Sequence, residues 1–126
     1  MDKEHRVRSR GDFIRVQRDG RRLAHPLLRL QWAANGLDVT RFGFVVGKRV
    51  ARKAHERNLV RRRLRALARS RVAQLAPGMD IVVIAQRPAA TASFAELATA
   101  LQQLIRRAPL AGSQSGEGSA ADATAP

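Results

Sequence analysis

Residues 48–71 read KRVARKAHERNLVRRRLRALARSR and contain eleven lysines and arginines but only one acid, Glu56. Hydrophobic residues recur three and four positions apart in the second half, which predicts a helix that packs on a core. These residues are Val60, Leu64, Leu67, Ala68, Val72 and Leu75. Arginine recurs every four residues along one flank of the same helix, at Arg57, Arg61, Arg65 and Arg69. We therefore expect a central helix with one buried face and one strongly basic flank.

The basic flank calls for an anionic partner. Like charges one helical turn apart repel each other and cost an isolated helix about 0.2–0.5 kcal/mol per pair. The acids that usually accompany a solvated basic face are missing here, and the whole chain carries a net charge of +14. Most of that charge is arginine, whose planar guanidinium binds phosphates through paired hydrogen bonds. A solvated face remains the alternative, but the composition favours nucleic acid or an anionic membrane as partner.

Several other classes of protein are disfavoured by composition. The chain has no cysteine, which excludes disulfides and a thiolate zinc site. His5, His25 and His55 are not at metal-ligand spacing, so we expect no metal site on the protein. We also expect no catalytic nucleophile, carboxylate pair or histidine dyad. There is no apolar run near 18 residues and no signal-peptide pattern, which predicts a cytoplasmic protein without a membrane partner.

The rest of the chain predicts a small α+β domain. Patterns and caps place a short helix between Ser9 and Gly20, three strands, the central helix, a further strand and a final helix. The three early strands and the later one are expected at 21–24, 27–34, 40–47 and 80–85, and the final helix at 93–107. The order is α-β-β-β-α-β-α, a one-domain α+β sandwich over residues 1–108. Residues 109–126 are Ala, Gly and Ser-rich and predict a disordered tail.

Three details of packing can be predicted as well. The Asn35-Gly36 pair is a hairpin signal, so strands 27–34 and 40–47 are expected to pair antiparallel. If the strands joined by the central helix are parallel neighbours, a right-handed crossover is the default. The strand over 80–85 is apolar throughout, which predicts burial on both sides. The buried stripe of the final helix is expected to comprise Phe94, Leu97, Leu101, Leu104 and Ile105.

Two features of the first half have two interpretations each. One face of the strands carries Arg29, Gln31, Arg41 and Gly43, which could form the floor of a groove or an ordinary solvent-facing surface. Phe13 could pack on the sheet as a core residue or present its ring to a nucleobase as a stacking platform. The local pattern favours a core role for Phe13 and does not decide the role of the sheet face.

The run KRVARKAHERNLVRRRLR strongly resembles the signature of the bacterial ribonuclease P protein subunit, roughly V-S-K-K-x-G-x-A-x-x-R-N-x-x-K-R-x-x-R. The matching or conservatively substituted positions are Lys48, Arg49, Ala54, Arg57, Asn58, Arg61, Arg62 and Arg65. The resemblance extends over about residues 5–107 and includes Asp12-Phe13, Gly20, Asp80 with its strand, Arg87-Pro88 and the segment 93–97. The chain departs from the pattern at Gly47, where Ser is usual, at Ala51, where Gly is usual, and at Gln17 and Gln31, where aromatics are common.

This resemblance implies a fold and a function. The fold would be like domain 2 of ribosomal protein S5, with a left-handed βαβ crossover in place of the right-handed default. The protein would bind a large catalytic RNA, one protein per RNA, and assist it in removing the 5′ leader of precursor tRNA by hydrolysis. The chemistry would belong to the RNA and to Mg²⁺ ions bound mainly by it. The protein would supply affinity and positioning, and would be inactive alone.

The resemblance also implies two sets of site residues. Those facing the catalytic RNA would be Lys48, Arg49, Lys53, Arg57, Asn58, Arg61, Arg62, Arg65 and Arg69. Those lining a cleft for the single-stranded leader would be Phe13, Gln17, Arg29, Gln31 and Val45. The resemblance thus favours a stacking role for Phe13, while glutamines at 17 and 31 weaken base stacking elsewhere in the cleft.

Two rival functions follow from charge and fold alone. The first is a non-enzymatic RNA-binding protein of ribosomal type, which only the Arg57-Asn58 signature and its flanks separate from a ribonuclease P subunit. The second is a DNA-binding module, which is disfavoured because the basic helix has no helix-turn-helix partner and no heptad repeat.

Overall fold

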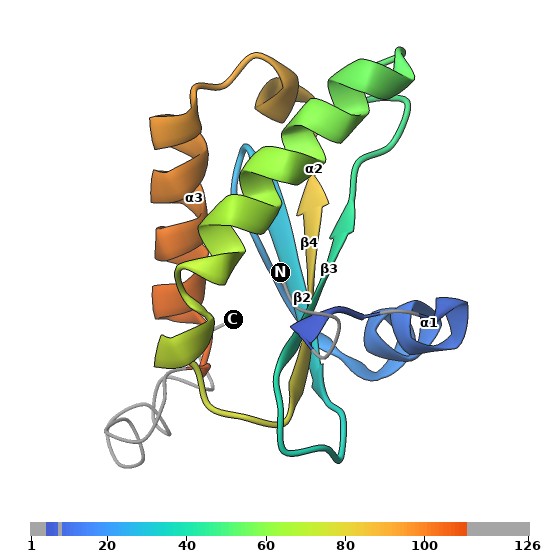
Figure 1. Cartoon of the computed structure of the whole chain (residues 1–126), viewed down its shortest axis with the longest axis vertical. Coiled ribbons are helices and arrows are strands. Elements are labelled where there is room, and N and C mark those ends of the chain that lie inside the picture. The colour runs from blue at the N-terminus through green and yellow to red at the C-terminus, as the bar shows by residue number, and fades with distance from the viewer. Residues whose placement is uncertain (1–4, 8, 111–126) are drawn as a thin grey trace.

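The computed structural model describes residues 5–7 and 9–110 of the chain (Figure 1). Its main elements are α1 (Arg10–Asp19), β1 (Arg21–Ala24), β2 (Leu28–Ala34), β3 (Arg41–Val45), α2 (Ala54–Arg69), β4 (Met79–Ala85) and α3 (Phe94–Arg107). Two short 3₁₀ helices, Val72–Gln74 and Arg87–Ala90, follow α2 and β4. The predicted order α-β-β-β-α-β-α is confirmed.

Side-chain caps fix the start of α1 and the start of α3. The Ser9 hydroxyl accepts a hydrogen bond of 3.0 Å from the Asp12 backbone N–H at the start of α1. Ser93 and Glu96 form a capping box, in which the Glu96 N–H donates to Ser93 Oγ and the Ser93 N–H donates to the Glu96 carboxylate. These groups satisfy backbone donors that the first helical turn leaves free, as the sequence predicted.

The sheet has the strand order β1-β2-β4-β3. β4 pairs antiparallel with β2 and parallel with β3, so the predicted hairpin between strands 27–34 and 40–47 is wrong. The turn at Asn35-Gly36 exists, with Gly36 at φ +75°, but β4 lies between the two strands that it connects. A strand that is buried on both faces is most stable in the middle of a sheet. That requirement of β4 outweighs the local turn signal.

α2 connects β3 to its parallel neighbour β4 by a left-handed crossover. Viewed from the side covered by α2, with both strands pointing upward, β4 lies to the left of β3 (Figure 1). The handedness implied by the family resemblance is therefore confirmed, and the right-handed default is wrong.

α2 and α3 cover one face of the sheet and form the main core with it (Figure 1). The buried stripe of α2 is Val60, Leu64, Leu67 and Ala68, as predicted, although the α-helix ends at Arg69 before Val72 and Leu75 join the core. On α3, residues Leu97, Leu101 and Leu104 are buried and Ile105 packs against them. Phe94 is 47% exposed, so its predicted place in the buried stripe is wrong.

Packing against the core continues two residues past residue 108, where the sequence predicts the domain to end. Leu110 is buried in the core, and its carbonyl accepts a hydrogen bond of 2.9 Å from the Ala76 N–H. Pro109 and Leu110 therefore belong to the packed domain. The remainder of the predicted tail, 111–126, lies outside the described residues.

Candidate RNA-binding surfaces

The nine residues predicted to face the catalytic RNA lie on α2 and on the connection that leads into it. Lys48, Arg49 and Lys53 are exposed on this connection. On α2, the exposed residues of the set are Asn58, Arg62 and Arg69. The half-buried ones are Arg57, Arg61 and Arg65. The predicted set thus lies on one helix and on the connection that leads into it, and we call these nine residues the α2 surface.

Some side chains of the α2 surface shape it from within. Arg57 Nη1 donates hydrogen bonds to the carbonyls of Ala51, at 3.0 Å, and Arg52, at 2.7 Å. Arg57 therefore fastens the basic connection to the first turn of α2. The backbone at Ala51 has no positive φ, so the glycine usual in the family pattern is not needed there.

No arginine of α2 forms an ion pair with a carboxylate within the described part of the chain. The ion pairs there are Arg15–Asp80, Arg18–Asp19, Arg41–Asp12 and Arg41–Asp80. The partners found for α2 arginines are neutral, such as the Asn58 side-chain oxygen, which accepts from Arg61 Nη1 at 2.7 Å. Arg65 Nε is buried without a hydrogen-bond partner. The charge of the α2 surface is therefore not compensated by any carboxylate in residues 5–7 and 9–110.

The opposite face of the sheet carries the residues predicted to line the leader cleft. Strand register places Arg29, Ile84 and Val45 in one row across β2, β4 and β3. Val45 is exposed, whereas Arg29 and Ile84 are half-buried. Ile84 was missed by sequence reasoning, because its strand reads as buried on both sides and gives no sign of an uncovered end. We call this row, with Phe13 and Gln17 of α1, the outer sheet surface.

α1 covers the next row of the same face. An added Cβ at Gly43 of β3 would lie 2.6 Å from Cε1 and Cζ of Phe13, so the ring packs directly on the glycine backbone. Phe13 nevertheless stays half-buried, and Gln17 is exposed. Gln31, in the same row as Gly43, is only 4% exposed. The structure thus leaves Phe13, Gln17, Arg29 and Val45 accessible to differing degrees and covers Gln31.

A buried carboxylate anchors α1 to the sheet. Asp80 is fully buried and accepts hydrogen bonds from Arg15 of α1 at 2.5 Å, from Arg41 of β3 at 2.7 Å and from Asn35 at 3.0 Å. Burial raises the pKa of Asp80. Hydrogen bonds from Arg41 and Asn35 and the charges of Arg41 and Arg15 lower this pKa, and together they outweigh the effect of burial. The net pKa lies below the ordinary value. Asp80 thus stays ionised and holds α1 in position.

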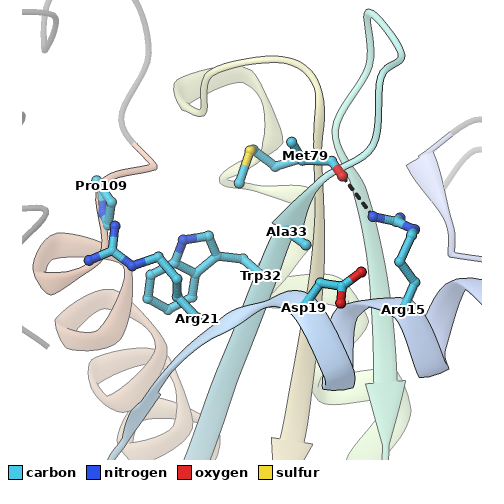
Figure 2. Close-up of a pocket in the computed structure, with 8 residues that line it drawn as sticks. Arg15, Asp19, Arg21, Trp32, Ala33, Met79 and Pro109 are labelled. Carbon is cyan, nitrogen blue, oxygen red and sulfur yellow. Dashed lines mark hydrogen bonds between the residues drawn. The ribbon is translucent and has the colours of Figure 1, made fainter.

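Arg15 also borders a hollow of about 510 Å³ at the end of the sheet away from Val45 (Figure 2). Trp32 and Met79 lie on one side of this hollow, and Arg15 and Asp19 of α1 on the other (Figure 2). Arg15 Nη1 donates a hydrogen bond of 2.7 Å to the Ala34 carbonyl. This contact adds a second anchor between α1 and β2.

Two absences in residues 5–7 and 9–110 bear on the kind of site. No group of three or more His, Cys, Asp or Glu side chains there could hold a metal ion. No helix in the same residues is both long and apolar enough to cross a membrane. Asp80 and Asp12 are instead paired with arginine.

An α+β domain whose central helix carries arginines without a carboxylate partner among the described residues has the features of a nucleic-acid-binding protein. Comparisons with known proteins identify the family. The family model described as Ribonuclease P matches residues 1–109. The ribonuclease P protein component of Roseiflexus castenholzii is 40% identical over 109 residues, covering 86% of this chain and 88% of its own.

Two further relatives agree in sequence and in structure. The ribonuclease P protein component of Streptomyces avermitilis is 42% identical over 113 residues, covering 82% of this chain and 91% of its own. The solved RNase P protein of Thermotoga maritima is 29% identical, with a TM-score of 0.74 and coverage of 82% of this chain and 96% of that chain. The chain belongs to the ribonuclease P protein family, and is a subunit of that endoribonuclease.

Proposed function

We propose that this subunit binds the catalytic RNA of ribonuclease P through the α2 surface and the 5′ leader of precursor tRNA through the outer sheet surface. The observation that carries this proposal is the arginine flank of α2, which has no carboxylate partner among the described residues. Unpaired guanidiniums on a helix repel each other until an external anion neutralises them. In a ribonuclease P subunit, the phosphates of the catalytic RNA would be these anions.

The α2 surface suits a folded RNA in which strands crowd together. Exposed Arg62 and Arg69 would contact phosphates directly, and each contact would release condensed counterions. Arg57 would act from behind, because its hydrogen bonds to the carbonyls of Ala51 and Arg52 hold the basic connection in place. Lys48 and Lys53 would thus reach the RNA from a fixed loop, which lowers the entropy lost on binding.

The outer sheet surface suits an extended single strand. Val45 and Ile84 offer apolar area to nucleobases, and Arg29 in the same row offers a cation to the phosphates. Phe13 rests on Gly43 and would stack a base with the part of its ring that remains accessible. Gln31 is covered, so its contribution would be to support this surface from below.

The protein's part in catalysis would be to bind and orient. Magnesium ions would be held by RNA, because the described residues offer no cluster of metal ligands. Arginines placed among RNA phosphates lower the local negative charge, so the active RNA fold would need less Mg²⁺. We propose one protein per catalytic RNA, acting in the cytoplasm where precursor tRNA is processed.

The test is cleavage of a precursor tRNA by the catalytic RNA transcribed from the same genome, at a Mg²⁺ concentration too low for that RNA alone. We expect the wild-type protein to restore removal of the leader, and Arg62→Ala to restore it less well. Arg106→Ala is the matched control, because it removes the same charge from the exposed last turn of α3. Absence of stimulation by the wild-type protein, or cleavage by the protein without RNA, would overturn the proposal.

A further inference from the structure

The helical layer also contains a hollow between α2 and the start of α3. It measures about 370 Å³ and is lined by Leu59, Ala66 and four arginines of α2 and by Phe94 of α3. Those arginines are Arg62, Arg63, Arg65 and Arg69, and no lining residue is acidic. The hollow therefore combines an aromatic ring with a positive rim.

The apolar part of this hollow is unusually open to solvent. The large hydrophobic side chains that are exposed within the described residues are Ile14, Leu37, Val45, Leu59 and Phe94. Leu59 and Phe94 both line this hollow, and Phe94 is the aromatic member of the set. Clustered exposed apolar side chains usually mark an interaction site, whereas single ones do not.

The position of Phe94 is fixed by its neighbours. It is the first residue of α3, directly after the Ser93 cap, whose capping box with Glu96 holds the first turn. Arg63 Nη1 donates a 3.4 Å hydrogen bond to the carbonyl of Ala92, just before the cap. α2 and the start of α3 are thus tied together, and the ring is held beside the arginines.

One donor within the lining is unsatisfied. Arg65 Nε is buried and has no hydrogen-bond partner. A buried donor without an acceptor costs about 1–3 kcal/mol, and a ligand would satisfy it only after the Arg65 side chain turns toward the hollow. Arg62 and Arg69, both exposed, can contact phosphates on either side of such a ligand.

From these observations we infer that the hollow binds one unpaired nucleotide of the catalytic RNA, with its base stacked on Phe94 and its phosphates held by the arginine rim. Base stacking on an aromatic ring tolerates any base, because every base has a π face. The positive rim matches a nucleic acid and repels a second copy of this basic chain. The inference rests on the proposed function for the identity of the RNA.

The catalytic RNA fits this position better than the leader does. The hollow lies in the layer of α2 and α3, whereas the outer sheet surface lies on the α1 side of the sheet. Arg62, Arg65 and Arg69 belong both to the hollow and to the α2 surface. One RNA molecule that covers the α2 surface would therefore reach the hollow without crossing the sheet.

The test measures the affinity of the catalytic RNA from the same genome for the wild-type protein and for Phe94→Ala, Phe94→Leu and Phe94→Trp. Loss of one stack predicts that Phe94→Ala weakens binding about tenfold. The slope of affinity against salt should stay unchanged, because no charge is removed. Phe94→Leu should resemble Phe94→Ala, and Phe94→Trp should bind at least as tightly as wild type.

Leu37→Ala is the control, because it truncates another exposed apolar residue away from the hollow and should leave binding unchanged. Nuclease footprints should show that Phe94→Ala loses protection at unpaired nucleotides only. Thermal unfolding of each variant checks the fold, and Phe94→Leu and Phe94→Trp decide the outcome if the alanine variant is unstable.

Three results would overturn the inference. They are wild-type affinity in Phe94→Ala, wild-type affinity in Phe94→Leu, and a loss confined to precursor tRNA. The proposed function fails separately, if the wild-type protein neither binds nor activates the catalytic RNA. If the wild-type protein does both and Phe94→Ala matches it, only the stacking site is lost.

Discussion

Asp80→Asn removes the charge at the point where α1 is attached to the sheet. Asp80 is 0% exposed and accepts hydrogen bonds from two arginines on different elements, Arg15 of α1 and Arg41 of β3. The asparagine amide keeps one acceptor but turns an N–H₂ group toward the guanidiniums. The substitution therefore leaves the Arg15 and Arg41 guanidiniums beside a neutral side chain whose N–H₂ group repels them. The side-chain volume changes little.

The cost can be bounded from the exposure of the two arginines. Breaking a buried ion pair by removing one partner typically costs about 3–5 kcal/mol. The side chain of Arg15 is 29% exposed and can recover some hydration, and that of Arg41, at 15%, keeps Asp12 at 3.3 Å. We therefore expect the lower end of the range, about 3 kcal/mol of unfolding free energy.

The same substitution should change how stability depends on pH. Because the folded-state pKa of Asp80 lies below its ordinary value, its ionised form favours folding. That contribution is complete above the unfolded pKa of about 4 and is lost as the pH falls through the folded pKa. The difference between wild type and Asp80→Asn should accordingly be largest near neutral pH and shrink under acid conditions.

Urea unfolding at neutral and acid pH measures both effects, with Asp12→Asn as the matched control. Asp12 is partly exposed and contacts Arg41 at 3.3 Å, so its loss should cost below about 1 kcal/mol. Since α1 carries part of the outer sheet surface, Asp80→Asn should also weaken the binding of precursor tRNA more than the binding of the catalytic RNA. A cost below about 1 kcal/mol for Asp80→Asn, or equal losses for both RNAs, would refute the anchoring role.

Three further substitutions test single contacts. Gly43→Ala should lower the unfolding free energy by about 1–3 kcal/mol, because the added Cβ meets the Phe13 ring. Adding Phe13→Ala should remove most of that clash. If the costs of the two substitutions simply add in the double variant, the two residues do not make this contact. Val45→Glu should weaken binding of precursor tRNA but not of mature tRNA, by repelling leader phosphates, while Leu37→Glu should affect neither; equal losses for both tRNAs would argue against a leader site. Ser93→Ala should cost about 1 kcal/mol in thermal unfolding through loss of the α3 cap; an unchanged melting temperature would be the contrary result.

Most of the local structure could be predicted from the sequence, because helix caps and apolar periodicity are local signals. Ser9 and Ser93 start their helices as predicted, and Val60, Leu64 and Leu67 form the buried stripe of α2. These features depend on neighbours within one or two helical turns. A single chain contains the whole of that information.

Strand order depends on competition between distant segments and was predicted less well. The Asn35-Gly36 signal correctly marked a turn, but it could not show that β4 enters between the strands it connects. The apolar run 81–85 had already indicated a strand buried on both faces. A strand of that kind requires neighbours on each side, and this physical requirement identifies the central position better than the turn does.

The candidate site was predicted as a set of residues but not in its contacts. Spacing placed Arg57, Arg61 and Arg65 on one flank, yet the hydrogen bonds of Arg57 to Ala51 and Arg52 depend on the fold of the preceding connection. Phe94 was misassigned to the core because helical phase alone takes no account of where a helix begins. Its place at the first position of α3 leaves it exposed.

The salt dependence of binding to the catalytic RNA tests most directly whether the α2 surface contacts that RNA. Arg62→Ala and Arg69→Ala each remove one exposed guanidinium that has no carboxylate partner in the described structure, so each should lower the slope of log affinity against log salt by about one. Arg106→Ala should leave the wild-type slope intact. Unchanged slopes for the two α2 variants, or the same reduction in all three, would show that these arginines do not bind the RNA.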